Sequence, residues 1–270
     1  MHEKENAVAI RYNKDFTVVQ ANELVRSKQD ELSLLEAKLV RLAITQVLKE
    51  DTDLKTYSCD VVDLANFLGI SKTNIYRDIQ SLAQNLMKKS IFIKDTSSPS
   101  KNKGRENYRM FHWIDYVEYT DGTLTFKLSD TLKPYLVGLE QLFTTYGYDA
   151  IIELPTNYSI RLYELLASYQ NMTVRPEYDN NFTDIPIEKN ELIFTIEWLR
   201  EYFNCQDKYP NSGDFIRRVI DTSVTAIAAK TLMDLSYRTI RNGRTITHIV
   251  FKLGNWEGNS EELIRRLQER

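Results

Sequence analysis

The feature that most constrains the fold is an order of helices and hairpin that occurs twice along the 270 residues. In each half, segments with helical spacing of apolar residues precede two strand-like segments joined by a Gly-containing turn. The turn dipeptides are Asp121-Gly122 and Asn242-Gly243, residue types that favour tight hairpin turns. The halves share this order without obvious sequence identity. The chain is therefore predicted to contain two units of one architecture.

The first strong helix of the first half is expected to begin at Ser33. Ser33 and Glu36 match the S-x-x-E capping box, which satisfies free amide groups at a helix start. The apolar positions Leu35, Leu39, Leu42 and Ala43 then mark one face, and Leu32, Leu35, Leu39 and Leu42 also fit an a/d heptad pattern. Because two heptads are too few to identify a dimerising zipper, core packing is the favoured interpretation.

The stretch LANFLGISKTNIYRDI, residues 64–79, predicts a helix-turn-helix. One helix is expected over about 60–68 and the next over about 71–89, with Gly69 as the C-terminal cap of the first and Ser71 as the N-cap of the second. A polar loop, TSSPSKNKGREN, follows, and YRMFHWIDYVEYTDGTLTFKLSD then reads as two strands. Helices followed by a hairpin are typical of a winged-helix domain.

The second half repeats this order. Pro155 is expected at the first position of a helix over NYSIRLYELLASYQN, and Thr195 at the cap of TIEWLREYF. A long helix, DFIRRVIDTSVTAIAAK, follows with Ile216, Val219, Ile220, Ser223 and Ile227 facing inward. The segment LSYRTIRNGRTITHIVFKL completes the unit as a hairpin turning at Asn242-Gly243, with Ile249, Phe251 and Leu253 toward the core.

The predicted fold class is therefore α+β, with two tandem winged-helix domains. The length agrees, because single domains usually hold roughly 100 to 200 residues. The expected division is a flexible N-terminal segment over 1–19, a first winged-helix domain over 20–145, a second over 146–256 and a C-terminal tail over 257–270.

Charge is segregated along the chain, although the net charge is only -3. Residues 72–109 hold nine basic and three acidic side chains, and residues 217–252 hold seven and two. Residues 110–201, in contrast, hold six basic and fifteen acidic side chains. The two basic segments predict two surfaces that face anions.

Several kinds of chemistry lack a basis in the sequence. His2, His112 and His248 share no zinc-site spacing with Cys59 or Cys205, so no metal is expected. There is no GxxxxGK[ST] or GxGxxG motif, and no cofactor is expected. A DNA-nicking enzyme that attaches through a tyrosine needs a metal to polarise the phosphate, and the usual His pair is missing. We therefore expect a binding protein and no enzyme.

The cellular setting is predicted from the same composition. Two distant cysteines make a disulfide improbable, and the chain opens without an apolar signal core, so the reducing cytoplasm of a bacterium is expected. No apolar run approaches the ~18 residues of a membrane-spanning helix, and no membrane partner is expected.

Double-stranded DNA is the partner that the second unit predicts. Its long helix presents a polar face at the N-terminal end, which a recognition helix places against base edges, and arginine is well shaped to bridge guanine O6 and N7. The hairpin is expected to bring further arginines to its tip, where a wing meets phosphates or the minor groove. The candidates are Asp214, Arg217, Arg218, Asp221, Thr222, Arg238, Arg241 and Arg244.

The first unit offers a weaker copy of this surface. Its polar helix face could read adenine, contact phosphates or simply face solvent. The candidates on the helix are Lys72, Thr73, Asn74, Tyr76 and Arg77, and those in the loop beside the hairpin are Lys101, Lys103 and Arg105.

Where SGDFIRRVIDTSVTAI runs into LSYRTIRNGRTITHIVFKL, the chain resembles the replication initiator (Rep) proteins of iteron-containing plasmids. YSIRLYELLASY is similar to the start of that family's second winged helix, and LSLLEAKLVRLAI to the opening helix of its first. The likeness covers most of residues 20–255. It places the base-reading helix on Asp214 to Lys230 and matches Arg217 and Arg218 to the family's paired arginines.

The resemblance implies an initiator whose monomers bind direct repeats at a plasmid origin and whose dimers repress its own gene. It further implies that the first winged helix contacts another part of the repeat and supplies the dimer interface, and that the host initiator DnaA and the replicative helicase are partners. The acidic middle and the loop from Met172 to Asn190 depart from the family pattern. Two alternatives stay open, a tandem winged-helix repressor without a replication role and an origin-nicking enzyme.

Overall fold

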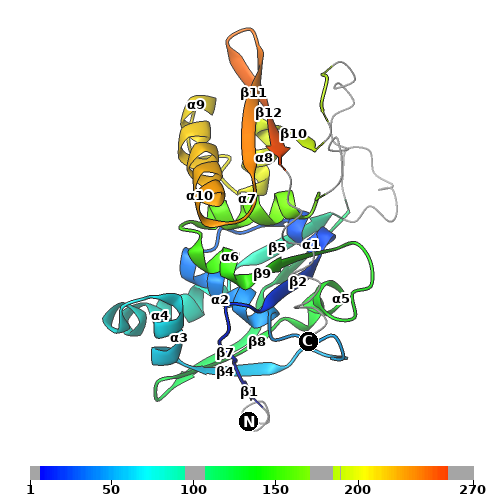
Figure 1. The fold of residues 1–270 in the computed structure, drawn as a ribbon. Coiled ribbons are helices and arrows are strands. Elements are labelled where there is room, and N and C mark those ends of the chain that lie inside the picture. The colour runs from blue at the N-terminus through cyan, green and yellow to red at the C-terminus, as the bar shows by residue number, and fades with distance from the viewer. Residues whose placement is uncertain (1–6, 95–106, 171–184, 189, 255–270) are drawn as a thin grey trace. The chain divides into compact units, whose positions relative to one another are not determined.

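The computed structural model describes residues 7–94, 107–170, 185–188 and 190–254, and it divides after Ile152 into two compact units (Figure 1). The predicted division lay earlier, between residues 145 and 146. The intervening residues belong to the first unit because strand β9 (Phe143–Gly147) pairs antiparallel with β2 (Thr17–Ala21). In helix α6 (Tyr148–Glu153), moreover, the Tyr148 hydroxyl donates to the Lys38 carbonyl oxygen at 2.9 Å.

The first unit is built around helix α2 (Leu34–Ile44), which is buried on nearly every side. A four-stranded sheet has the order β1 (Val8–Ala9), β4 (Thr56–Asp60), β8 (Thr123–Leu128), β7 (Ile114–Thr120). A three-stranded sheet has the order β3 (Lys28–Gln29), β5 (Ser90–Lys94), β6 (Tyr108–His112). The remaining elements are helices α1 (Asn22–Arg26), α3 (Val61–Leu68), α4 (Lys72–Leu86), η1 (Asp130–Leu132) and α5 (Lys133–Leu136).

The predicted start of α2 is confirmed. The Ser33 hydroxyl accepts from the Glu36 amide at 3.3 Å, and the Glu36 carboxylate accepts from the Ser33 amide at 2.8 Å, which is a complete capping box. Leu39, Leu42 and Ala43 are almost fully buried. The apolar face is therefore used by the core of its own unit, as the core-packing interpretation expected.

The helix-turn-helix of the first unit is also confirmed. The Asp60 carboxylate caps α3 by accepting from two amides, and Gly69 ends the helix in the left-handed region at φ 68°. Ser71 occupies the N-cap position of α4, but its side chain makes no capping hydrogen bond. Helix α4 ends at Leu86, short of the predicted residue 89, because the Lys88 and Lys89 amides bond only three residues back, in tight turns before β5 begins.

The segment predicted as two strands forms three. β7 and β8 make the expected hairpin, and Asp121 and Gly122 have positive φ angles of 49° and 83°, as a type I′ turn requires. β6, however, pairs with β5 and not with β7. The predicted strand is interrupted at Trp113, which lies between the end of β6 and the start of β7. The Trp113 side chain is fully buried.

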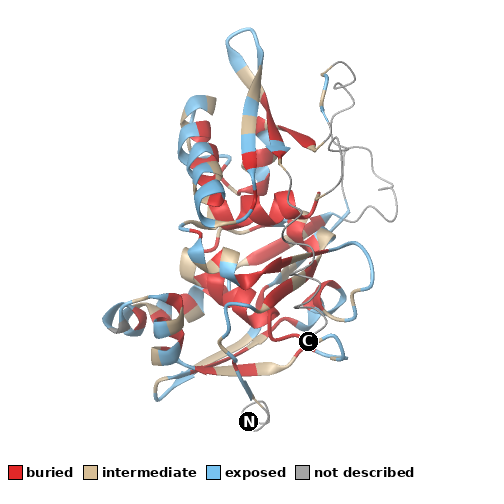
Figure 2. Cartoon of the chain, in the orientation of Figure 1, coloured by how far each residue is buried: buried red, intermediate tan, exposed pale blue. Residues whose placement is uncertain are grey.

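The second unit combines helix α7 (Asn157–Ala167) and α8 (Ile196–Tyr202) with a continuous helical run, α9 (Ser212–Phe215), η2 (Ile216–Asp221) and α10 (Thr222–Lys230). Its sheet has the order β10 (Glu191–Thr195), β12 (Thr245–Leu253), β11 (Leu235–Asn242). Figure 2 shows the β11–β12 hairpin buried at its base and exposed at its tip. This is the winged-helix arrangement predicted for the second half.

Two local predictions in the second unit need correction. Helix α7 begins after Thr156, whose hydroxyl accepts from the Ser159 amide at 3.0 Å, so Pro155 precedes the cap and is not the first helical residue. The hairpin turns at Gly243 and Arg244, because Asn242 still pairs with Thr245. Gly243 has a φ of 60° as the first central residue, which suits a type II′ turn.

The predicted cap at Thr195 is confirmed, since its hydroxyl accepts from the Trp198 amide at 2.9 Å. Ile249, Phe251 and Leu253 are buried on β12, as expected. The two cysteines, Cys59 and Cys205, are buried thiols that form no disulfide.

Gly69 offers a test of the turn in the first helix-turn-helix. An added Cβ at Gly69 meets no atom within 4 Å, so the cost of Gly69→Ala comes from the left-handed backbone alone. We expect the free energy of unfolding to fall by about 1 kcal/mol in urea denaturation. Gly69→Asn, which tolerates this conformation better, is the matched control and should lose less. Equal losses for both variants would contradict this explanation.

Candidate nucleic-acid interface

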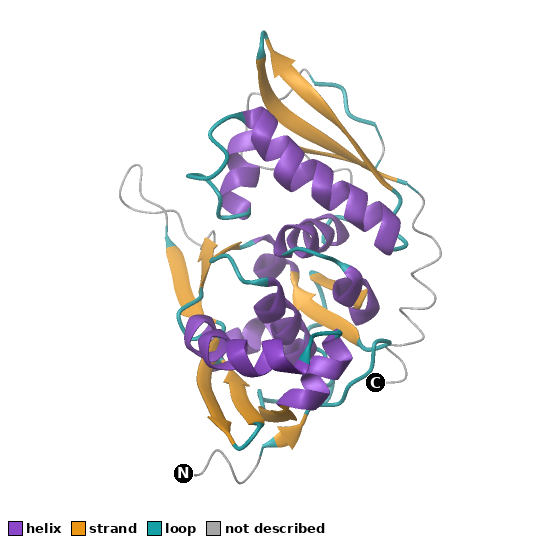
Figure 3. Cartoon of the chain, turned by 90° about the vertical axis from the view of Figure 1, so that its left-hand side faces the viewer, coloured by secondary structure: helices purple, strands orange, loops and turns teal. Residues whose placement is uncertain are grey.

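The helical run α9–η2–α10 of the second unit provides the candidate recognition surface, and Figure 3 shows it lying along the β11–β12 hairpin. It begins two residues earlier than the predicted Asp214. The reason is Asn211, whose side-chain oxygen accepts from the Asp214 amide at 2.7 Å and so caps the helix.

The helix separates an apolar face from a polar face, as the sequence predicted. The predicted inward residues Ile216, Val219, Ile220, Ser223 and Ile227 are all buried. The outward set consists of Arg217, Arg218, Asp221, Thr222 and Thr225, and every member is exposed.

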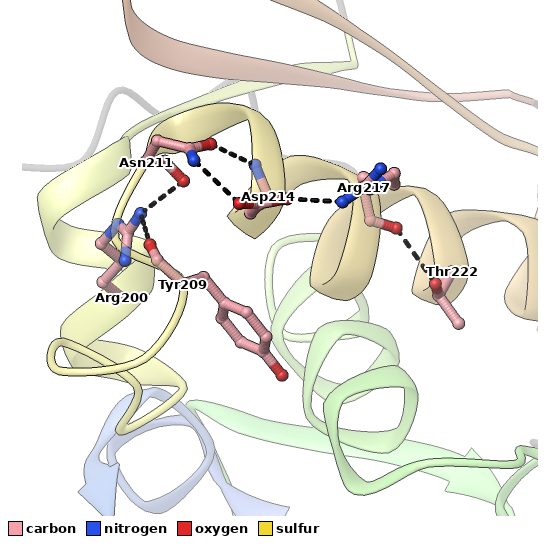
Figure 4. Close-up of polar contacts among 6 residues, drawn as sticks. All are labelled: Arg200, Tyr209, Asn211, Asp214, Arg217 and Thr222. Carbon is pink, nitrogen blue, oxygen red and sulfur yellow. Dashed lines mark hydrogen bonds and ion pairs between the residues drawn. The ribbon is translucent and has the colours of Figure 1, made fainter.

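The middle of this helix, η2, is a π-helical segment that the sequence did not predict. There the Thr222 hydroxyl donates to the Arg217 carbonyl oxygen, five residues earlier, at 3.2 Å (Figure 4). A π segment widens the helical turn, so residues four and five apart lie close to one face. Arg217, Asp221 and Thr222 therefore present their side chains together.

Arg200 of α8 holds the turn that leads into the recognition helix. Its guanidinium donates to the backbone oxygens of Tyr209 at 2.7 Å and Asn211 at 3.1 Å (Figure 4), and also to that of Lys208 at 2.8 Å. The same guanidinium also lies 4.8 Å from the ring centroid of Phe215, the last residue of α9. Arg200 thus ties both sides of the turn to α8, a role that sequence analysis missed because the contacts depend on the folded loop.

The first turn of the helix orients Arg217. The side-chain amide of Asn211 donates to one carboxylate oxygen of Asp214 at 2.8 Å, and the Arg217 guanidinium donates to the other at 2.5 Å (Figure 4). Asp214 therefore acts within this chain as a support for Arg217. The Arg217 side chain remains 68% exposed, so most of its N–H groups face outward.

The hairpin brings two of the three predicted arginines to its tip. Arg244 lies in the turn, and the exposed Arg241 donates to the Arg244 carbonyl oxygen at 3.3 Å. Arg238, in contrast, lies farther down β11, opposite Val250. The predicted cluster of three at the tip is thus a pair.

Arg238 forms an ion pair at the base of the wing. Its Nη2 and Nε donate to the two carboxylate oxygens of Glu191 at 3.0 and 3.3 Å, and Nη2 also donates to the Pro186 carbonyl oxygen at 3.1 Å. The Glu191 side chain is only 5% exposed. The hydrogen bond from Arg238 lowers the pKa of Glu191 below its ordinary value. The pair therefore fixes β10 to β11 across the sheet.

The first unit presents part of its predicted surface on α4. Thr73, Asn74, Tyr76 and Arg77 are exposed. Arg77 is held by its neighbour Asp78, with N–O distances of 2.7 and 3.1 Å, and this hydrogen bonding lowers the pKa of Asp78. The Lys72 side chain and the predicted loop residues Lys101, Lys103 and Arg105 lie outside the described part of the chain.

The described residues include no group of three or more His, Cys, Asp and Glu side chains suited to a metal ion. Among the same residues, no helix is long and apolar enough to cross a membrane. What the geometry does offer is a polar helix face beside a hairpin with an arginine tip, which is an arrangement for docking on duplex DNA.

Family models match both units. The model described as "Initiator Replication protein, WH1" matches residues 17–167, and the one described as "Initiator Rep protein, WH2" matches residues 195–253. The chain belongs to this family of replication initiators. The tandem winged-helix fold class inferred from the sequence is thereby confirmed.

Individual relatives agree with this assignment. The PI protein of Escherichia coli is 25% identical over 273 residues, which cover 91% of this chain and 85% of that protein. Among solved structures, the Pi initiator protein in complex with iteron DNA matches with a TM-score of 0.62 at 19% identity. That match covers 91% of this chain and all of the other, and it supports the same fold.

The ion pair at the wing base of this initiator leads to a stability prediction. Replacing Arg238 by Met leaves the buried Glu191 carboxylate without its main donor, so we expect the free energy of unfolding to fall by about 1 to 3 kcal/mol. Lys252→Met is the matched control, because Lys252 pairs with the exposed Glu188 at 2.7 Å, and its loss should cost clearly less than that of Arg238. Urea denaturation of both variants measures the difference, and equal losses would contradict the role given to Glu191.

The lowered pKa of Glu191 also predicts a pH dependence. A carboxylate with a lowered folded-state pKa stabilises the fold above its ordinary value of 4.5 and loses this contribution as the pH falls through the folded pKa. The wild type should therefore lose more stability below that value than a variant combining Arg238→Met with Glu191→Gln. Parallel pH profiles for the two proteins would count against the prediction.

Proposed function

We propose that this initiator is a sequence-specific double-stranded DNA-binding protein that starts plasmid replication by binding direct repeats, or iterons, at the origin. The observation that carries the proposal is the paired arginines exposed on a capped recognition helix beside an arginine-tipped wing. The similarity to a Pi initiator protein in complex with iteron DNA supports it.

The residues of the second unit take different roles in this proposal. Arg217 and Arg218 face base edges in the major groove, where arginine bridges guanine O6 and N7. Asp221 and Thr222 lie on the same exposed face and join them. Arg241 and Arg244 at the wing tip contact phosphates or the minor groove. Asp214 and Arg238 contribute by holding the helix and the wing in place.

The first unit adds auxiliary contacts to another part of the repeat. The exposed residues of α4 that would make these contacts are Thr73, Asn74, Tyr76 and Arg77. The further candidates are Lys72, Lys101, Lys103 and Arg105. Two recognition helices that dock in successive major grooves would cover roughly 20 base pairs. We also assign to this unit the dimer interface through which the protein represses its own gene.

The proposed initiation is non-catalytic and takes place in the bacterial cytoplasm, where the plasmid lies. Several bound copies would strain neighbouring DNA, with the host DnaA protein and the replicative helicase as further partners. A nicking enzyme would instead leave a covalent protein-DNA adduct on supercoiled DNA with a divalent metal. Denaturing gels of such a reaction should show no adduct, and an adduct would overturn this part of the proposal.

Replication and repression can be separated genetically. The test plasmid carries this gene and its flanking DNA, and no other origin that the host can use. It should replicate in that host. Footprinting on the same DNA should show protection at regularly spaced direct repeats. Repression of the gene's promoter without replication would favour the alternative, a tandem winged-helix repressor.

Arginine substitutions test the division of labour within the second unit. Arg217→Ala or Arg218→Ala should weaken binding to the repeat by about 1 to 3 kcal/mol and relax base choice, because a base contact is lost. Arg241→Ala, the matched control, should weaken specific and random DNA alike and reduce the salt slope by about one, because a phosphate contact is lost. Titrations by fluorescence anisotropy at several salt concentrations measure both effects. Equal losses of Arg217→Ala on specific and random DNA would remove its assignment as a base reader.

A further inference from the structure

A side-chain hydrogen bond between Tyr237 and Asp221 joins the wing strand to the recognition helix. The Tyr237 hydroxyl, on β11, donates to the Oδ1 of Asp221, on η2. Asp221 lies on the exposed face of the helix with Arg217 and Arg218. The contact therefore connects the wing directly to the surface that faces DNA in the proposed function.

Tyr237 is well placed to hold this carboxylate still. Its ring packs against Phe251, with ring centroids 6.3 Å apart and planes inclined by 46°, and Phe251 is fully buried in the sheet. A phenol supported by the core has few alternative rotamers, so its hydroxyl fixes the position of the group it bonds. Partial burial, together with the Asp221 carboxylate, raises the pKa of Tyr237, and the phenol thus stays a hydrogen-bond donor.

The second oxygen of Asp221 is the part left for a ligand. Within the described part of the chain, Oδ2 of Asp221 accepts no hydrogen bond. A carboxylate repels phosphates, so its place beside two arginines on a DNA-facing helix needs another explanation. In the major groove the cytosine N4 amino group is a donor that an Asp side chain accepts from.

We propose that Tyr237 is a positioning residue for base recognition, which holds the Asp221 carboxylate so that its second oxygen accepts from the N4 amino group of a cytosine in the repeat. This inference rests on the proposed function and deepens it. Tyr237 itself contacts no base. It acts through Asp221 and makes the reading of one base pair depend on the wing strand.

The test is selection from a duplex library randomised over roughly two helical turns, with the full-length chain and its variants. Tyr237→Phe keeps the ring on Phe251 and removes the hydroxyl. We expect this variant to enrich the wild-type motif, except that the preference for one C·G pair falls by about threefold to tenfold. The salt slope should stay the same, because no phosphate contact is lost. Tyr119→Phe, which removes an exposed hydroxyl on β7 with no partner among the described residues, is the matched control and should enrich the wild-type motif.

A double-mutant cycle separates positioning from general support. Asp221→Asn should lose the preference at the same base pair, and adding Tyr237→Phe to it should cause no further loss. A loss spread evenly over all positions, with a lower thermal midpoint, would mean that Tyr237 merely supports the fold and would overturn the inference. An unchanged motif for Tyr237→Phe would also overturn it while leaving the proposed function intact. If the wild-type chain enriches no sequence at all, the proposed function itself fails, and this inference fails with it.

Discussion

The recognition surface depends first on the guanidinium of Arg200. The turn between α8 and the recognition helix is neither helix nor strand, and it carries Asn204 and Tyr209 with positive φ angles. Arg200 supplies donors to three carbonyl oxygens of this turn and stacks on Phe215 of the helix it leads into. A charged planar group with fixed donor directions can satisfy such a loop where an ammonium could not. This contact ties the start of the recognition helix to α8.

Internal pairing then decides which charges of the second unit are available to a ligand. Counting residues gives a basic segment over 217–252, but Arg238 is bound to Glu191 and Lys252 to Glu188. Arg217 is partly committed to Asp214. Among the described residues, Arg218, Lys230, Arg241 and Arg244 form no ion pair, and Lys230 lies exposed at the last position of α10. The available positive charge is therefore concentrated on the helix face and the wing tip, and the base of the sheet is close to neutral.

Local signals in the sequence predicted most of the fold. The predicted capping residues Ser33 and Thr195 act within three positions, and the apolar spacing of the recognition helix identified its buried face. Features that depend on distant pairing were not predictable in this way. The break at Trp113 arises because β6 pairs with β5. Arg238 is held at the base of the wing by Glu191, which lies 47 residues away in the sequence. The π segment over Ile216–Asp221 was likewise not predicted from the residue types.

The described arginines on the two helices differ in how their N–H groups are engaged, and this difference supports the unequal roles proposed for the two units. On α4 the guanidinium of Arg77 is engaged twice by the adjacent Asp78, so a phosphate or base would have to compete with a neighbouring carboxylate. On the recognition helix, Asp214 binds Arg217 from one turn below and leaves the outer N–H groups exposed, while Arg218 is unpaired among the described residues. Both side chains stay largely exposed, Arg77 at 70% and Arg217 at 68%, but Asp78 engages two N–H groups of Arg77 whereas Asp214 engages one of Arg217. In the proposed function, this difference favours Arg217 over Arg77 as the reader of bases.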